Sequence, residues 1–134
     1  LAFATGKKQA TLKRTMLDTV SEIKPGMIVK TKGSIIPMSV NAVEGMQVAC
    51  YWFDGNILNK GDFSFWDLSA SEPQPVENSI AMGNTVRLRS GSPLMYVEKI
   101  EFKKNKPHAI CSWQAGNAHY LKKFNALALV RVDH

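Results

Sequence analysis

Two stretches of the sequence decide the fold: KPGMIVKTK at Lys24–Lys32 and AMGNTVRLR at Ala81–Arg89. An offset of 57 residues superimposes them, so that Gly26 pairs with Gly83. After the glycine, both stretches alternate apolar and polar residues, which is typical of a β-strand. An internal repeat therefore begins here, and a repeat determines the architecture before any other feature does.

The repeat continues to the end of the chain with a single insertion. Four extra residues in the second copy, in the polar stretch Lys103–Pro107, change the offset to 61. Rare residue types keep one order in both copies, which chance agreement does not produce. The later pairs include Cys50 with Cys111, Trp52 with Trp113, Phe63 with Phe124 and Leu68 with Leu129. The chain thus holds two diverged copies of one small domain.

A polar segment at residues 69–79 separates the copies. It contains Pro73 and Pro75, and two nearby prolines favour an extended, fairly stiff connector. Before the first copy, apolar residues between Leu12 and Val20 recur at helical spacing, so the N-terminal segment is either a docking helix or a disordered tail. The predicted organisation is a tail or short helix at 1–22, a first barrel at 23–71, a linker at 72–79 and a second barrel at 80–132.

Each copy predicts short strands bounded by turn residues. Asp54-Gly55 lies between two apolar–polar alternations, a strong hairpin signal because both residues accept positive φ. Five short strands per copy indicate an all-β fold, and we expect two tandem small SH3-like five-stranded barrels. The expected strands are 27–31, 38–43, 47–53, 57–63 and 67–69, then 85–89, 95–102, 109–114, 118–124 and 129–132.

Composition places the chain among soluble globular proteins. Hydrophobic residues make up 45% of the sequence, and no apolar run approaches the roughly 18 residues needed to cross a bilayer. Strand alternation puts Cys50 and Trp52 on one face, and it does the same for Cys111 and Trp113. We expect these side chains in two separate cores. Unpaired buried thiols indicate a reducing compartment, so we expect a cytoplasmic protein without a membrane partner.

Two motifs resemble a known family. Gly83–Val97 reads GNTVRLRSGSPLMYV, and Cys50–Gly55 reads CYWFDG. Together they resemble the YodC-like family of small bacterial proteins, a domain of unknown function, here in two tandem diverged copies. Thr31–Pro37 departs from the family's compact Ser-Gly-x-Pro turn, and Gln114–Gly116 stands where Phe-Asp-Gly is expected. The resemblance implies the small barrel and supplies no activity, catalytic residue or cofactor.

The sequence offers little for catalysis, so we expect no enzyme, no cofactor and no metal site. It contains no His-x-x-x-His or Cys-x-x-Cys pair, the spacings typical of metal sites. Cys111 with His108 or His119 has the chemistry of a thiol–imidazole pair. However, strand alternation places Cys111 beside Trp113 in the core, whereas a reactive cysteine needs exposure.

Charge is distributed unevenly between the copies. Residues 23–71 hold four lysines against four acidic residues, whereas residues 80–132 hold nine Lys or Arg against two Glu, a net charge of +7. This asymmetry indicates a polyanionic partner, because cations that neutralise phosphates release counterions. Basic residues also simply keep a small domain soluble. The expected nucleic-acid or polyanion contacts are Arg87, Arg89, Lys104, Lys106, Lys122 and Lys123, with Tyr96, Phe102 or Tyr120 available for stacking.

The competing hypothesis is a protein-interaction module. The neutral first copy is rich in aromatic residues, of which Trp52 and Phe63 fit its core. Tyr51, Phe53 and Trp66 then remain for an apolar patch, which marks either a partner site or the contact between the two barrels. We expect Phe53 and Trp66 at a protein contact. The prediction as a whole is a non-enzymatic binding or adaptor module.

Overall fold

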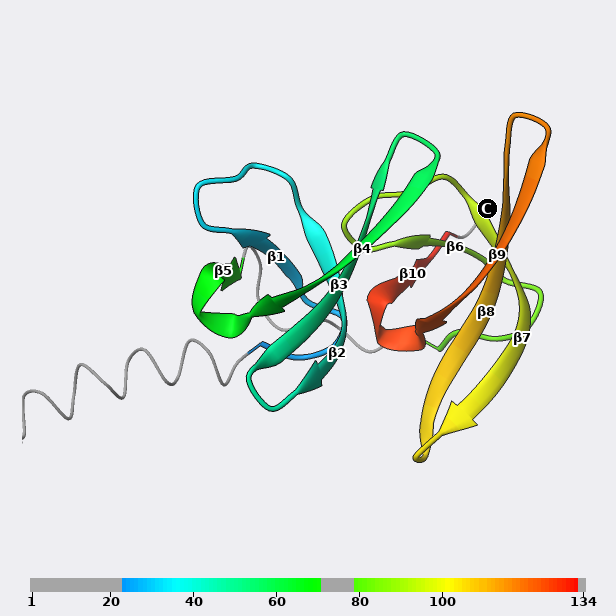
Figure 1. The fold of residues 1–134 in the computed structure, drawn as a ribbon. Helices are drawn as coiled ribbons and strands as arrows, with labels where there is room; N and C mark the ends of the chain where they lie inside the picture. Colours follow the sequence, from blue (N-terminus) through cyan, green and yellow to red (C-terminus); the bar gives the residue numbers. More distant parts are fainter. Residues whose placement is uncertain (1–22, 71–78, 133–134) are drawn as a thin grey trace, which may run out of the picture.

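The computed structural model describes residues 23–70 and 79–132, whose strands form two five-stranded antiparallel sheets (Figure 1). The first sheet has the order β4-β3-β2-β1-β5, and the second has the order β9-β8-β7-β6-β10. The all-β prediction is confirmed, and both sheets share one topology. The strands are β1 (Ile28–Thr31), β2 (Met38–Glu44), β3 (Gln47–Asp54), β4 (Ile57–Ser64), β5 (Leu68–Ala70), β6 (Thr85–Leu88), β7 (Met95–Lys103), β8 (Lys106–Ala115), β9 (Ala118–Asn125) and β10 (Leu129–Arg131).

Irregularities of the sheets repeat as the sequence does. The pairing of β2 with β3 shifts register at Val40–Ala42, and the pairing of β7 with β8 shifts at Val97–Lys99, which is the aligned position. A 3-10 turn precedes the last strand of each sheet, η1 (Phe65–Asp67) in the first copy and η2 (Ala126–Ala128) in the second. Aligned residues therefore have the same place in the fold.

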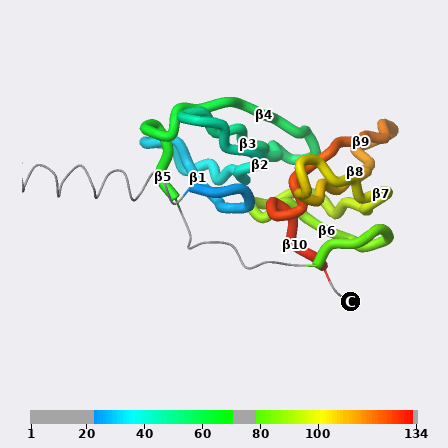
Figure 2. Tube along the Cα trace, turned by 90° about the horizontal axis from the view of Figure 1, so that it is seen from below, coloured from blue at the N-terminus to red at the C-terminus, as the bar shows by residue number. Residues whose placement is uncertain are grey.

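Neither sheet closes into a barrel through its strand ladders. β4 and β5 are the edges of the first sheet, and β9 and β10 are the edges of the second. Figure 2 shows the two curved sheets side by side. The predicted tail at 1–22 and residues 72–78 of the predicted linker lie outside the described residues. Within residues 23–70 and 79–132, no helix has the length and apolar character that crossing a membrane requires.

Each sheet encloses its own hydrophobic core, because alternate strand residues point inward. Cys50 and Cys111 are buried and unpaired in different cores, as predicted. Trp113 is buried in the second core, and Trp52 packs half-buried against the first. The first core contains Ile23, Met27, Val29, Met38, Val40, Val48, Cys50 and Leu68, and the second contains Val86, Leu88, Met95, Val97, Ala109, Cys111, Trp113, Phe124, Ala128 and Leu129.

The two copies pack against each other along a contact that we call the seam. Tyr51 on β3 meets Phe124 on β9 edge to face, with ring centroids 5.2 Å apart. Phe53 meets Trp113 in the same manner, also at 5.2 Å. Leu58 of β4 also packs against the second core. One face of the first sheet therefore covers the open side of the second core.

Polar groups fix the register of the seam. The fully buried Ser39 hydroxyl donates to the Ser90 hydroxyl at 2.7 Å and accepts from the Ser90 backbone N–H at 2.9 Å. The Asn125 backbone N–H donates to Asn41 Oδ1 at 2.7 Å, and the Asn125 amide donates to the Asn41 carbonyl oxygen at 3.2 Å. Each bond contributes roughly 0.5–1.5 kcal/mol, and loss of one partner leaves a buried polar group unsatisfied.

Candidate nucleic-acid interface

The β7–β8 hairpin is where the second copy departs visibly from the first. β7 and β8 have nine and ten residues, whereas β2 and β3 have seven and eight. The four extra residues lengthen the hairpin, which projects at the lower edge of Figure 1. Lys104 and Asn105 make the turn with φ of 52° and 65°. Positive φ at both central residues is the geometry that matches the twist of a hairpin.

The end of this hairpin, Phe102–His108, concentrates positive charge, and we call it the basic tip. Lys103, Lys104 and Lys106 are exposed there, and the Phe102 side chain is 72% exposed. In the described parts of the chain, none of these three lysines forms an ion pair. The structure thus brings the predicted Lys104 and Lys106 together and adds Lys103 to them.

Glu101 neutralises one of the predicted cations. Its carboxylate lies 3.1 Å from Lys123 Nζ and 3.5 Å from Lys99 Nζ. The hydrogen bond and charge of Lys123, with a smaller effect of Lys99, lower the pKa of the Glu101 carboxyl below its usual value. Neighbouring residues on a strand point to opposite faces, so Lys123 does not share a face with Lys122. Lys123 therefore pairs with Glu101 on the face of β9 that points away from the seam.

The two predicted arginines lie on or beside β6, apart from the basic tip. Arg87 is exposed on β6, which pairs with β7 at Met95. Met95 precedes Lys103 by eight residues, which is about 26 Å of extended strand. Arg89 Nε donates to the Leu127 carbonyl oxygen at 2.9 Å and so ties the chain after β6 to η2. The six predicted residues consequently do not form one patch.

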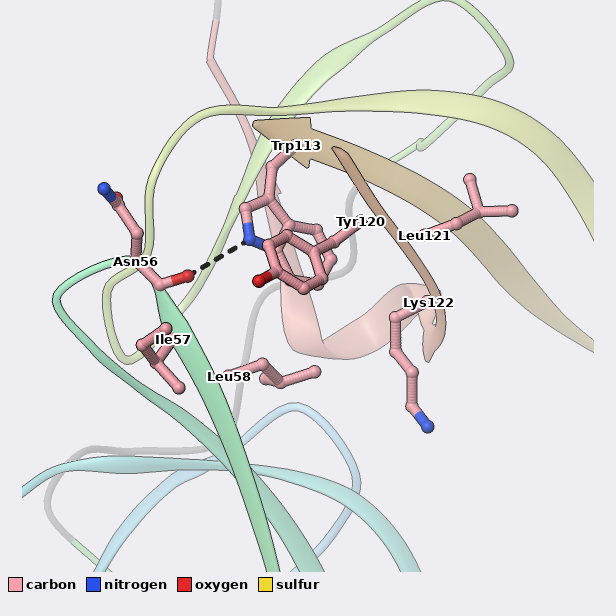
Figure 3. Close-up of a pocket in the computed structure, with 7 residues that line it drawn as sticks. All are labelled: Asn56, Ile57, Leu58, Trp113, Tyr120, Leu121 and Lys122. Carbon is pink, nitrogen blue, oxygen red and sulfur yellow. Dashed lines mark hydrogen bonds between the residues drawn. The ribbon is translucent and has the colours of Figure 1, made fainter. Parts of the chain in front are cut away.

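Lys122 belongs to a different site, a pocket of about 250 Å³ in the seam (Figure 3), which we call the seam pocket. The indole of Trp113 stacks against Tyr120, with centroids 5.4 Å apart and planes 20° apart. Trp113 Nε1 donates to the Asn56 carbonyl oxygen at 3.3 Å, and Lys122 Nζ lies 5.8 Å from the centre of the Tyr51 ring, within cation–π range. The pocket is lined by Asn56, Ile57 and Leu58 of the first copy and by Trp113, Tyr120, Leu121 and Lys122 of the second.

The basic tip borders a second cavity, of about 280 Å³, at the other end of β9. It also lies between the copies, and among its described lining residues one carboxylate, Glu44, accompanies three lysines and a histidine. β9 links the two cavities, because Tyr120 lines the first and Asn125 lines the second. The lining residues are Pro25, Asn41, Ala42, Val43, Glu44, Lys103, Lys104, Lys106, His108 and Asn125.

Neither thiol is placed for nucleophilic chemistry. Burial raises the pKa of Cys111 to about 12, and burial together with the charge of Asp62 raises the pKa of Cys50 to about 12. Both thiols are therefore protonated at neutral pH and hidden from solvent. The Cys111 thiol points to the Ala109 carbonyl oxygen at 3.8 Å. Among the described residues, no group of three His, Cys, Asp or Glu side chains is arranged to hold a metal ion.

The residues predicted for a protein contact separate in space. Phe53 is half-buried against Trp113, so it serves the contact between the copies and is not free for an external partner. Tyr51 also lies in the seam, and its burial raises the pKa of its phenol. Trp66 remains 39% exposed, edge to face with Phe65 at 4.5 Å.

The chain matches no family model, no curated protein and no solved structure. The resemblance to YodC-like proteins therefore stays a prediction from Gly83–Val97 and Cys50–Gly55. The sequence patterns missed Asn56, Ile57 and Leu58, since a hairpin signal within one copy does not reveal what that hairpin meets in the other.

Proposed function

We propose that this chain is a non-enzymatic binding module, built from two SH3-like units, whose basic tip binds nucleic acid. One observation carries the proposal: a projecting hairpin presents, beside an exposed phenylalanine, three exposed lysines that form no ion pair within residues 23–70 and 79–132. Two buried thiols outside any disulfide fit a reducing compartment, in keeping with a cytoplasmic protein.

The proposal rests on elementary electrostatics. Lys103, Lys104 and Lys106 can each neutralise a phosphate and release a condensed counterion, which makes affinity fall linearly with the logarithm of salt concentration. Phe102 adds an aromatic face on which a base can stack. The second copy can bind phosphates because its two carboxylates are already engaged. Glu98 accepts a hydrogen bond from Ser112, and Glu101 forms ion pairs with Lys123 and Lys99.

A second candidate function is protein binding at the end of the first copy. η1 is held between two turns: the Lys32 N–H donates to the Asp67 carbonyl oxygen, and the Phe65 N–H donates to the Met46 carbonyl oxygen. Large apolar side chains are exposed around these turns, and such groups mark interaction surfaces. They are Ile35 at 88%, Met46 at 56%, Ile36 at 53% and Trp66 at 39% exposed.

Binding of labelled nucleic acid at several salt concentrations tests the proposal. The Lys104→Glu/Lys106→Glu variant should lose roughly tenfold or more in affinity at low salt, and two lost phosphate contacts should reduce its salt slope by about 1.8 on a duplex or about 1.4 on a single strand. The matched control is Lys30→Glu/Lys32→Glu, which makes the same charge change on the first copy. Equal losses of affinity in the two variants would mean that only the net charge of the protein matters. Absence of binding at low salt would contradict the proposal.

A further inference from the structure

We propose that the seam pocket holds one unstacked base of a single-stranded nucleic acid. This inference rests on the proposed function and names the form of nucleic acid that the module takes. The pocket combines an aromatic face, an apolar wall and a cation, all fixed by the packing of the two copies.

The aromatic face is supplied by Tyr120 and is held rigidly. Trp113 behind it is 5% exposed and is fixed by its hydrogen bond to Asn56 and by the edge-to-face contact with Phe53. Tyr120 stacks on this indole and is still 40% exposed. A ring that is backed by another ring and open to solvent is a platform on which a base stacks with little cost in side-chain entropy.

The remaining walls suit a flat, weakly polar group beside a phosphate. Ile57 and Leu58 form the apolar side opposite Tyr120, and Figure 3 shows the Lys122 side chain at the edge of the same opening. None of the described residues that line this pocket carries a carboxylate. A base can therefore lie between Tyr120 and the aliphatic side chains while its phosphate reaches the Lys122 ammonium.

The size of the pocket limits the occupant to one base. Pockets for drug-sized ligands run from about 300 to 1,000 Å³, and the seam pocket has about 250 Å³. A base inside a duplex is stacked on both sides and cannot enter, so the strand has to be single. An aromatic side chain of a peptide has a similar size, but the lining offers it a lysine and no acidic group.

The two basic sites lie within reach of one strand. β8 runs from Lys106 in the basic tip to Trp113 in the seam pocket, seven residues or about 23 Å of strand. A few extended nucleotides cover this distance, which is within the roughly 4–16 nucleotides that an OB fold binds. The seam pocket would therefore take a base, and the basic tip would take phosphates of the same strand.

A base-free probe tests the inference. Two single strands of about 12 nucleotides are compared, one ordinary and one with abasic sites, so that both carry the same phosphates. Tyr120→Leu should weaken binding of the ordinary strand about 5- to 150-fold, the loss of one stacking contact, and should leave binding of the abasic strand unchanged. The matched control is Trp66→Leu, because Trp66 is 39% exposed, close to the 40% of Tyr120, and lies on the first copy outside the seam pocket.

The wild-type protein provides a second reading that needs no variant. It should bind the ordinary strand more tightly than the abasic strand and more tightly than a duplex of the same sequence. Equal binding of the ordinary and abasic strands, or equal effects of Tyr120→Leu and Trp66→Leu, would overturn the seam pocket as a base site while leaving the basic tip intact. If neither strand binds at low salt, both the proposed function and this inference are wrong.

Discussion

The two copies share one fold but present opposite surfaces at equivalent positions. In the first copy, β3 turns Tyr51 and Phe53 toward the second copy, where both pack on aromatic rings. The residues aligned with them in β8 are Ser112 and Gln114, and the Ser112 hydroxyl donates to Glu98 at 2.6 Å. The same face of the same sheet is therefore apolar where it meets a neighbour and polar where it does not.

The contact face of the first copy is not repeated in the second copy. The seam is a heterologous contact, since the β3–β4 face of the first copy covers the β8–β9 side of the second. Heterologous contacts form rings or open arrays when every unit carries both contact faces. Ser112 and Gln114 remove that face from the second copy. Topology thus provides the scaffold, and the side chains on one face decide what packs against it.

The largest expected effect on stability concerns Phe63 and Phe124, which the repeat aligns. Phe124 is fully buried and contacts both Tyr51 and Trp113, whereas Phe63 is half-buried and contacts Trp52. Phe124→Ala should cost about 3–5 kcal/mol of unfolding free energy, because it opens a cavity and loosens the seam. Phe63→Ala should cost distinctly less. Urea unfolding followed by tryptophan fluorescence measures both, and equal costs would show that the seam adds nothing to the second core.

A smaller effect should distinguish two glycines at equivalent turns. Gly26 and Gly83 have φ of 96° and 93°, so an alanine at either position carries the same left-handed strain, about 1–2 kcal/mol. A Cβ on Gly26 would also lie 2.3 Å from the Leu127 carbonyl oxygen in the other copy, whereas a Cβ on Gly83 would meet only the Tyr96 hydroxyl, at 3.9 Å. Gly26→Ala should therefore lose a further 1–3 kcal/mol or so by overpacking the seam.

Thermal and urea unfolding of both alanine variants measure this difference directly. The strain cancels between the two, so the difference reports the contact between the copies. Matching losses would mean that the first copy can move away from η2 without cost, and the seam would then be too weak to hold its pocket in shape.

The sequence predicted what depends on local pattern. The strands around Gly26 and Gly83, the hairpin at Asp54-Gly55 and the two separate cores follow from alternation and turn chemistry, which act within a few residues. The repeat also placed Cys50 and Cys111 correctly, because aligned residues share a structural role. Closed barrels were predicted as well, but no ladder joins β4 to β5 or β9 to β10.

The sequence could not decide which residues form the contact between the copies, or which charges pair. Lys122 and Lys123 look equivalent in the chain, yet one lies over Tyr51 in the seam and the other pairs with Glu101. The sequence left Phe53 either at a partner site or at the contact between the two barrels, because the residue that covers it, Trp113, is sixty residues away in sequence. Such outcomes depend on how two finished units dock, which no periodicity within one unit encodes.

The smallest expected effect compares the two thiols through their response to pH. Burial raises both pKa values from 9.0 to about 12, so the folded state keeps its protons while the unfolded state loses them above pH 9. The unfolded state then binds fewer protons, and stability must fall as pH rises from 9 toward 12. At pH 9.5 each thiol should cost up to about 1 kcal/mol relative to pH 7. Replacing Asp62, whose aligned residue is Lys123, with Asn should reduce this cost at Cys50 alone.

Urea unfolding at pH 7 and pH 9.5 measures this effect in the wild type, Cys50→Ala, Cys111→Ala and Asp62→Asn. Each alanine variant loses some packing at both pH values, so only the change between the two pH values is compared. That change should shrink in both alanine variants, and it should shrink in Asp62→Asn only while Cys50 is present. A change that is identical in all four proteins would mean that other groups set the alkaline limit, and that the two copies hold their thiols in less apolar cores than their burial implies.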